Sequence, residues 1–153
     1  MLKVIPSLFL KIYVNKNKFL KENEFLNIEH LVFNQGPKRV GPFSHAVKAG
    51  GFLFVTGQMP TLTNDPTKLI DGGISAQTHQ VMKNLKTVLT ASNSSLKNVV
   101  FVRIYLVNFK DFDKMNIIYE SYFEPDKLPA RTCIGVTGLA VDASIEIDLI
   151  AKY

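Results

Sequence analysis

Within the run from Ser144 to Ile150, near the C-terminal end of the chain, apolar and acidic residues alternate from Ile145 to Leu149. Side chains of a β-strand point alternately to its two faces, so this run predicts a half-buried strand. Its apolar face consists of Ile145, Ile147, Leu149 and Ala151. The opposite face presents Glu146 and Asp148. The chain must therefore form a sheet with a core on one side and acidic groups on the other.

A second strand, predicted from Leu128 to Ile134, places Arg131 and Cys133 on one of its faces. We expect the two strands to lie close together in one sheet, with these side chains and Glu146 on the faces that the core does not need. An arginine, a thiol and a carboxylate can together form a catalytic or binding site. The alternative is a cross-strand ion pair between arginine and glutamate, which half-exposed strands often carry and which adds little stability.

The length of 153 residues is typical of one domain, and 46% hydrophobic and 20% charged residues are typical of an ordinary globular fold. The single cysteine excludes an intramolecular disulfide. The three histidines stand at no metal-ligand spacing, so we expect no metal site. The net charge of +5 is spread along the chain without a basic cluster rich in aromatic residues, which argues against a nucleic-acid surface.

Residues 1–29 differ in composition from the rest, and we assign them to an N-terminal extension that is either a targeting segment or a disordered tail. The apolar stretch from Val4 to Leu10 is far too short to cross a membrane. The extension contains no arginine, unlike an ordinary mitochondrial presequence. The compartment stays open: the cytoplasm, or a mitochondrion or plastid if the extension is a transit peptide. Residues 30–153 form one domain.

Within this domain the predicted order is strand, strand, strand, helix, strand, helix, strand, strand. Gly50 and Gly51 are expected to join the second and third strands as a hairpin. A loop is expected over 58–73, where proline, glycine, asparagine and aspartate are frequent. The first three strands are expected at 30–33, 41–47 and 52–56.

Two helices are expected, with Ser75 capping the first and Asp111 capping the second. Their buried stripes are Val81, Leu85, Val88 and Leu89 in the first helix, and Phe112, Met115, Ile118, Tyr119 and Tyr122 in the second. Between the helices, the run 99–107 is apolar on both faces, so this strand needs cover from both sides. Two helices cover only one side, and we expect another subunit to cover the other.

Four motifs stand in the chain at GPFSHA 41–46, GQMP 57–60, PARTC 129–133 and IEI 145–147. In this order and at this spacing they resemble the RidA family, which is also called YjgF or L-PSP. The resemblance extends from about residue 35 to residue 152 and implies an α+β fold, in which a mixed β-sheet carries two helices packed on one face, as in chorismate mutase. It also implies a homotrimer with an inner β-barrel and with sites in clefts between subunits.

The same resemblance implies hydrolysis of reactive enamines and imines, such as 2-aminoacrylate and 2-iminobutanoate, to 2-ketoacids and ammonia. Arg131 would bind the carboxylate of this small substrate through two charge-assisted hydrogen bonds. Glu146 would hold a water and accept its proton. Cys133 and Gly57 would line the pocket, and Asn116 would add a hydrogen bond. We expect no cofactor, because a protonated imine is already a good electrophile.

Phe43 stands where related proteins usually carry tyrosine, so this pocket lacks a phenolic donor. Ala140 stands where proline is common. Cys133 would need a base that lowers the pKa of its thiol to act as a nucleophile, and no histidine is placed for this. Two other functions stay open: a single-strand-specific endoribonuclease that inhibits translation, and a non-catalytic trimeric binder of small ligands.

Overall fold

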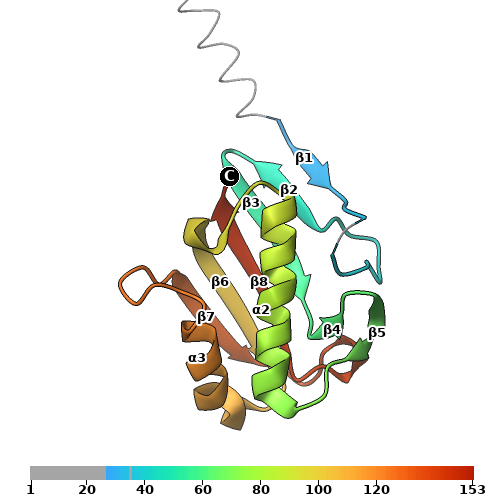
Figure 1. Ribbon diagram of the computed structural model, residues 1–153, viewed down its shortest axis with the longest axis vertical. Coiled ribbons are helices and arrows are strands. Elements are labelled where there is room, and N and C mark those ends of the chain that lie inside the picture. The colour runs from blue at the N-terminus through green and yellow to red at the C-terminus, as the bar shows by residue number, and fades with distance from the viewer. Residues whose placement is uncertain (1–26, 35) are drawn as a thin grey trace, which may run out of the picture.

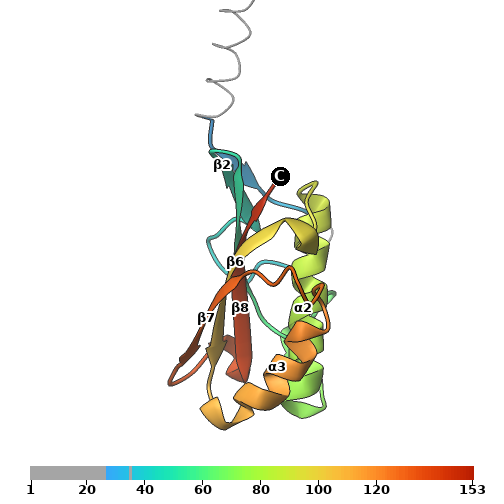
Figure 2. The ribbon, with the colours of Figure 1, turned by 90° about the vertical axis from the view of Figure 1, so that its left-hand side faces the viewer.

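The computed structural model describes residues 27–34 and 36–153. Six strands form one mixed sheet in the order β1-β2-β3-β8-β6-β7, and the helices of the described residues lie on one of its faces (Figures 1 and 2). The predicted α+β fold is therefore confirmed. The strands of the sheet are β1 (Glu29–Leu31), β2 (Ala46–Ala49), β3 (Phe52–Gln58), β6 (Val99–Leu106), β7 (Ala130–Gly135) and β8 (Ile145–Lys152). The helices are α2 (Gly73–Ala91) and α3 (Phe112–Glu120).

Residues 1–26, which make up most of the predicted extension, lie outside the described residues. Glu29, the last residue assigned to the extension, belongs to β1, which pairs antiparallel with β2. The sheet therefore includes this one residue of the predicted extension.

Strand β8 lies inside the sheet between β3 and β6, and it pairs antiparallel with both. The predicted alternation is confirmed, because Ile145, Ile147 and Leu149 are buried while Glu146 and Asp148 are only partly covered. Strand β7 runs parallel to β6 at the edge of the sheet. The strands that carry Arg131 and Glu146 thus share one sheet, as expected, but β6 separates them.

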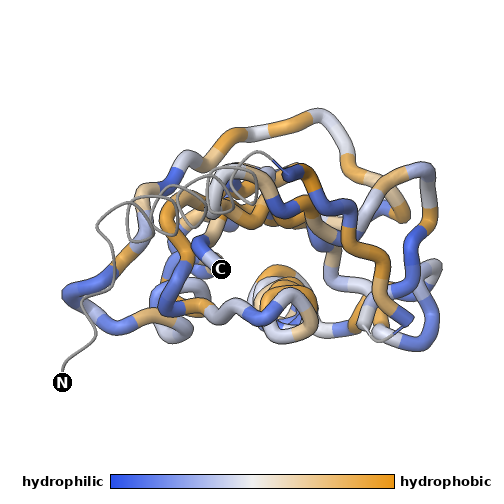
Figure 3. The backbone as a smooth tube through the Cα atoms, turned by 90° about the horizontal axis from the view of Figure 1, so that it is seen from above, coloured by the Kyte–Doolittle hydropathy of each residue, from blue (hydrophilic) through white to orange (hydrophobic). Residues whose placement is uncertain are grey.

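The core lies between the sheet and the helices. The predicted stripe of α2 is confirmed, since Val81, Leu85, Val88 and Leu89 are at most 1% exposed. In the view from above, sheet and helices form two layers, and the side of the helix that faces the sheet is mostly hydrophobic (Figure 3). Met115 and Tyr119 of α3 belong to the same core. Burial of one such large apolar side chain contributes about 1.5–3 kcal/mol.

The predicted helix caps are wrong in one case and incomplete in the other. Helix α2 begins before Ser75, at Gly73, and the preceding Gly72 has a left-handed φ of 109°. Two adjacent glycines turn the chain into the helix without a side-chain cap. Asp111 occupies the position before α3 but forms no capping hydrogen bond. Instead, the Asn108 side chain accepts a backbone N–H in the short 3₁₀ turn that precedes α3.

The predicted loop over 58–73 contains a small hairpin, formed by β4 (Thr61–Leu62) and β5 (Asp65–Leu69). The Asp65 side chain stabilises this hairpin by accepting from the backbone N–H of Thr67 at 3.1 Å. Asn84 of α2 anchors it, donating to the carbonyl oxygen atoms of Met59 at 2.9 Å and Thr61 at 3.0 Å. Turn residues dominate the composition here, which concealed the two short strands.

The helix-free face of the sheet carries apolar side chains from several strands. Phe54 of β3 is 45% exposed, and Phe52 and Ile134 are also exposed. Phe101 and Tyr105 of β6 are half-buried, whereas Val102, Ile104 and Leu106 of the same strand are buried under the helices. Strand β6 is therefore apolar on both faces, as its sequence indicates. Cover of the second face by another subunit stays a prediction.

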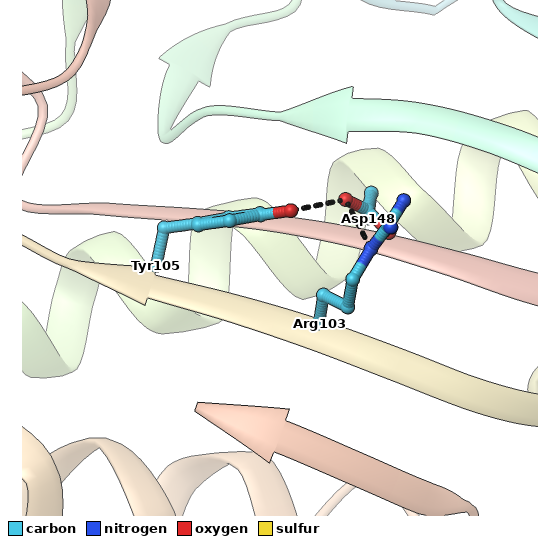
Figure 4. A network of polar contacts seen from close by, with 3 residues as sticks. All are labelled: Arg103, Tyr105 and Asp148. Atoms are coloured by element: carbon cyan, nitrogen blue, oxygen red, sulfur yellow. Dashed lines mark hydrogen bonds and ion pairs between the residues drawn. The ribbon is translucent and has the colours of Figure 1, made fainter. Parts of the chain in front are cut away.

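One polar network interrupts this apolar face (Figure 4). Nε of Arg103 donates to Oδ1 of Asp148 at 2.8 Å, and the Tyr105 hydroxyl donates to Oδ2 at 3.0 Å. All three side chains project from β6 and β8, whose register pairs Arg103 with Asp148. A cross-strand ion pair of the kind expected from the sequence is thus present, but it involves Arg103 rather than Arg131.

Within the described residues, no helix has the length and hydropathy needed to cross a bilayer. In the same part of the chain, no group of three or more His, Cys, Asp or Glu side chains is arranged to hold a metal ion.

Candidate functional site

Arg131 lies on β7 with its side chain turned toward α3. Its Nη1 donates to Oδ1 of Asn116 at 2.5 Å. The guanidinium carbon Cζ lies 5.0 Å from the ring centroid of Tyr119 and 5.7 Å from that of Phe112. Cation–π attraction to both rings and one hydrogen bond hold the guanidinium in place. Asn116 falls off the buried stripe of α3, and this position lets it reach the arginine.

A hollow of about 430 Å³ lies beside this guanidinium. Among the described residues, no carboxylate forms an ion pair with Arg131. The guanidinium therefore has donors available for an external anion, and the planar fork of arginine suits a carboxylate. The hollow is lined by Asn116, Tyr119, Glu120, Leu128, Pro129 and Arg131.

Cys133 is half-buried and packs against the core on the same face of β7 as Arg131. Burial raises the pKa of its thiol, although the positive charge of Arg131 opposes this shift. The thiol therefore stays protonated near neutral pH. Only the thiolate is a good nucleophile, so this protonation state disfavours covalent catalysis by Cys133. Its surroundings agree with a role in lining or packing.

Glu146 is half-buried on β8 and lies against Gly57 at the end of β3. A Cβ atom built on Gly57 would lie 1.9 Å from Oε1 of Glu146. The absence of a side chain at Gly57 therefore makes room for this carboxylate. Burial, and then repulsion by the neighbouring charge of Asp148, raise the pKa of Glu146. A carboxylate with a raised pKa is a stronger base than an ordinary surface glutamate.

The register of the sheet shows that Arg131 and Glu146 lie on opposite faces. Arg131 is paired with Val102, which is buried under the helices. Glu146 is paired with Tyr105, which in turn is paired with the exposed Ile134 on the helix-free face. Paired residues share a face. The prediction that the arginine, the thiol and the carboxylate of one chain share the face not needed for the core is therefore wrong.

Phe43 lies in the segment before β2, and its carbonyl oxygen accepts from Nη1 of Arg39 at 2.8 Å. A Cβ atom on Gly41 would lie 3.0 Å from the Phe43 ring, so the glycine lets the ring fold back over the chain. Within the described residues, no hydrogen bond or cation–π contact joins Phe43 to Arg131. Five of the six predicted site residues thus fall into two groups, Arg131 with Asn116 and Cys133, and Glu146 with Gly57.

His45, buried in the GPFSHA motif, was not recognised from the sequence as a structural residue. Its Nδ1 accepts from the Phe33 N–H at 3.1 Å, and its Nε2 lies 2.8 Å from the carbonyl oxygen of Pro37. These contacts require a neutral ring with the proton on Nε2. His45 therefore fixes the loop before β2. The sequence pattern gave no indication of this structural role, because the hydrogen-bond partners of His45 are backbone atoms, which every residue type carries.

Sequence reasoning also assigned Phe112 and Tyr119 only to the core stripe of α3, although both rings contact Arg131. The signal that could have found them is their spacing from Asn116, since residues three and four positions apart share a helix face.

A sequence model of the endoribonuclease L-PSP family matches residues 33–153. The chain belongs to this family. The resemblance of its motifs to RidA, YjgF and L-PSP proteins is thereby confirmed. The match covers nearly all described residues, including both groups of candidate site residues.

Similarities to individual proteins support this assignment. A RutC family protein of Pyrococcus horikoshii is 42% identical over 127 residues, which cover 81% of this chain and 98% of the relative. The mitochondrial protein MMF1 of Saccharomyces cerevisiae is 40% identical over 116 residues, covering 75% of this chain and 77% of the relative. A crystal structure of RidA from an Antarctic Psychrobacter species has a TM-score of 0.74 and 29% identity, and covers 82% of this chain and 99% of that one.

Proposed function

We propose that this L-PSP protein hydrolyses enamine and imine intermediates, such as 2-aminoacrylate and 2-iminobutanoate, to 2-ketoacids and ammonia. The observation that carries this proposal is the guanidinium of Arg131, which lacks an ion-pair partner among the described residues and lies beside a hollow of about 430 Å³. Such a site suits a small organic acid.

Arg131 binds the substrate carboxylate through two parallel hydrogen bonds. Asn116 and the two flanking rings restrict the rotation of the guanidinium, so less conformational entropy is lost when the substrate binds. Binding in this way fixes the imine carbon one bond away from the carboxylate. The small apolar wall formed by Leu128 and Pro129 suits a short alkyl side chain.

Glu146 supplies the base. An enamine first tautomerises to the imine, and the oxygen of a water then attacks the imine carbon while the C=N electron pair moves to nitrogen. Glu146 accepts the proton of the water, which gives a carbinolamine. Return of that proton to the amine makes ammonia the leaving group. The C–N bond then breaks as the hydroxyl oxygen forms the C=O bond of the ketoacid, and the hydroxyl proton passes to Glu146 and from there to solvent. The reaction needs no cofactor, because the protonated imine is electrophilic.

Because Arg131 and Glu146 of one chain face opposite sides of its sheet, the proposal requires two chains per site. Arg131 of one chain and Glu146 of a neighbouring copy would meet in a cleft between them. The exposed apolar side chains of the helix-free face support a homotrimer that buries this face in an inner barrel. Gly57 and Phe43 would line the cleft beside Glu146, and Cys133 would line it beside Arg131.

Decay of 2-iminobutanoate, generated by threonine dehydratase, tests this proposal. We expect the wild-type protein to accelerate decay, and Arg131→Ala to slow it on the order of 100-fold or more, because the carboxylate loses its partner. Arg131→Lys keeps the charge without the planar fork and should retain partial activity.

Three results would contradict parts of the proposal. A wild-type protein that adds nothing to the buffer rate has no deaminase activity. Equal rates for wild type and Arg131→Ala would exclude the proposed carboxylate clamp. Degradation of single-stranded RNA that disappears with Arg131→Ala would instead support the ribonuclease activity in the family's name.

A further inference from the structure

Tyr119 carries a buried hydroxyl group that forms no hydrogen bond within the described part of the chain. Its side chain is 4% exposed and packs against Phe123, with ring centroids 4.9 Å apart. Burying a hydroxyl without a partner costs about 1–3 kcal/mol. Phenylalanine would fill the same space without that cost. Packing alone therefore does not explain a tyrosine at this position.

The location of Tyr119 points to a ligand. Tyr119 lines the same hollow as Arg131, and its ring lies 5.0 Å from the guanidinium carbon. Asn116, one turn earlier on α3, binds the same guanidinium. The Tyr119 side chain is thus part of the wall of the carboxylate site proposed above.

Neighbouring tyrosines show how phenols are satisfied elsewhere in this fold. The Tyr122 hydroxyl lies 2.9 Å from Nδ1 of His79, and the Tyr105 hydroxyl donates to Asp148 at 3.0 Å. Of the buried side-chain nitrogen and oxygen atoms in the described residues, the Tyr119 hydroxyl is the one without a partner. This exception coincides with the proposed binding site.

The hydroxyl is available as a donor. Burial raises the pKa of Tyr119 to about 12, although the charge of Arg131 opposes the shift. The phenol therefore keeps its proton at physiological pH. An ionised carboxylate only accepts hydrogen bonds, so the two groups are complementary.

We infer that the Tyr119 hydroxyl donates a hydrogen bond to the carboxylate that Arg131 binds, which makes Tyr119 a further substrate-binding residue. This inference rests on the proposed function and adds a third donor to the guanidinium fork. Less than 1 Å² of the hydroxyl oxygen is open to solvent in the free chain. Pairing therefore requires the side chains that cover the hydroxyl to move when the ligand binds.

Tyr119→Phe in the full-length protein tests the inference. The probe is 2-oxobutanoate, the product ketoacid, whose Kd is measured by calorimetry alongside the KM for 2-iminobutanoate. We expect both constants to rise about tenfold, equivalent to about 1.4 kcal/mol. Because an unpaired buried hydroxyl is removed, we also expect Tm to rise by about 2–4 °C. Weaker binding together with higher stability would distinguish a binding role from a structural one.

Tyr122→Phe is the matched control, because it removes a phenol that is already hydrogen-bonded just after the end of α3. It should lower Tm and leave the Kd for 2-oxobutanoate unchanged. An unchanged Kd in Tyr119→Phe would overturn the inference, even if the wild type is an active deaminase. A lower Tm in Tyr119→Phe would also overturn it, because the hydroxyl would then have a partner in the free protein. If the wild type binds 2-oxobutanoate without turnover and Tyr119→Phe weakens that binding, the inference is supported while the deaminase proposal fails.

Discussion

Gly57→Ala is expected to displace Glu146 without unfolding the protein. The new Cβ would lie 1.9 Å from Oε1 and 2.9 Å from Cδ of Glu146, whereas ordinary contact begins at 3.4 Å. The carboxylate oxygen must therefore retreat by about 1.5 Å. The end of a flexible side chain can do so by rotation, and Gly57 does not have the positive φ that would strain an alanine. The folded state should change in stability by less than about 1 kcal/mol.

The catalytic effect should be much larger than the effect on folding. Misplacing a reacting group by about 1 Å can reduce a rate on the order of 100-fold. We therefore expect kcat for 2-iminobutanoate to fall by about that factor, while the urea midpoint of unfolding stays near that of the wild type. Gly138→Ala is the matched control, because a Cβ atom at Gly138 would meet nothing within 4 Å.

A double-mutant cycle with Glu146→Gln tests the reasoning itself. If Gly57→Ala acts only by moving the carboxylate, the double variant should be no slower than Glu146→Gln alone. Additive losses, or wild-type activity in Gly57→Ala, would refute the assignment of Glu146 as the base that this glycine accommodates.

Four further outcomes are expected. Deaminase activity should fall on acidification with a midpoint above pH 4.5, because the pKa of Glu146 is raised and the base must be ionised. The raised pKa also means that protonated Glu146 stabilises the folded state below pH 4.5, and that this stabilisation is lost as the pH rises through the folded pKa. Glu146→Gln should therefore raise the urea midpoint of unfolding at pH 7. Phe54→Glu should abolish both the proposed trimer, measured by light scattering, and the proposed deaminase activity, since it places a charge on the helix-free face. Leu85→Ala, at a position with 0% exposure, should lower the free energy of unfolding by about 2–5 kcal/mol.

Controls separate these effects from general damage. Like Phe54→Glu, Ile117→Glu replaces an exposed apolar residue by a charge, but it does so on α3, where Ile117 is 70% exposed. It should leave the assembly intact. A trimer that survives Phe54→Glu would show that another surface makes the contact. If the residual activity of Glu146→Gln still falls on acidification with the same midpoint, a group other than Glu146 causes the loss of activity.

The elements of this fold were largely predictable because their signals are local. Strand β8 alternates strictly, and the stripe from Val81 to Leu89 repeats at helical spacing, so the buried face of each element follows from the sequence. Helix starts and short strands were less predictable. Paired glycines replaced the side-chain cap expected at Ser75, and the residues that suggest a loop at 58–73 also accommodate a hairpin.

Candidate residues were predictable by type, whereas their arrangement was not. In β7 both faces are partly exposed, because the strand lies at the sheet edge and α3 covers it incompletely. The pattern around Arg131 therefore carries no hydrophobic contrast that would identify its buried face. The separation of Arg131 from Glu146, on which the proposal of two chains per site depends, follows only from the register with β6.

By itself, the sequence determined the family, the two helices, the half-buried C-terminal strand and the candidate residues for binding an acid and activating water. Tertiary structure decided which face each of them occupies, that Gly57 makes room for Glu146, and that the Tyr119 hydroxyl is buried beside Arg131. The physical reason is that periodicity within one segment reports burial of that segment alone. Contacts between side chains depend on how distant segments are paired, and no local pattern encodes that pairing.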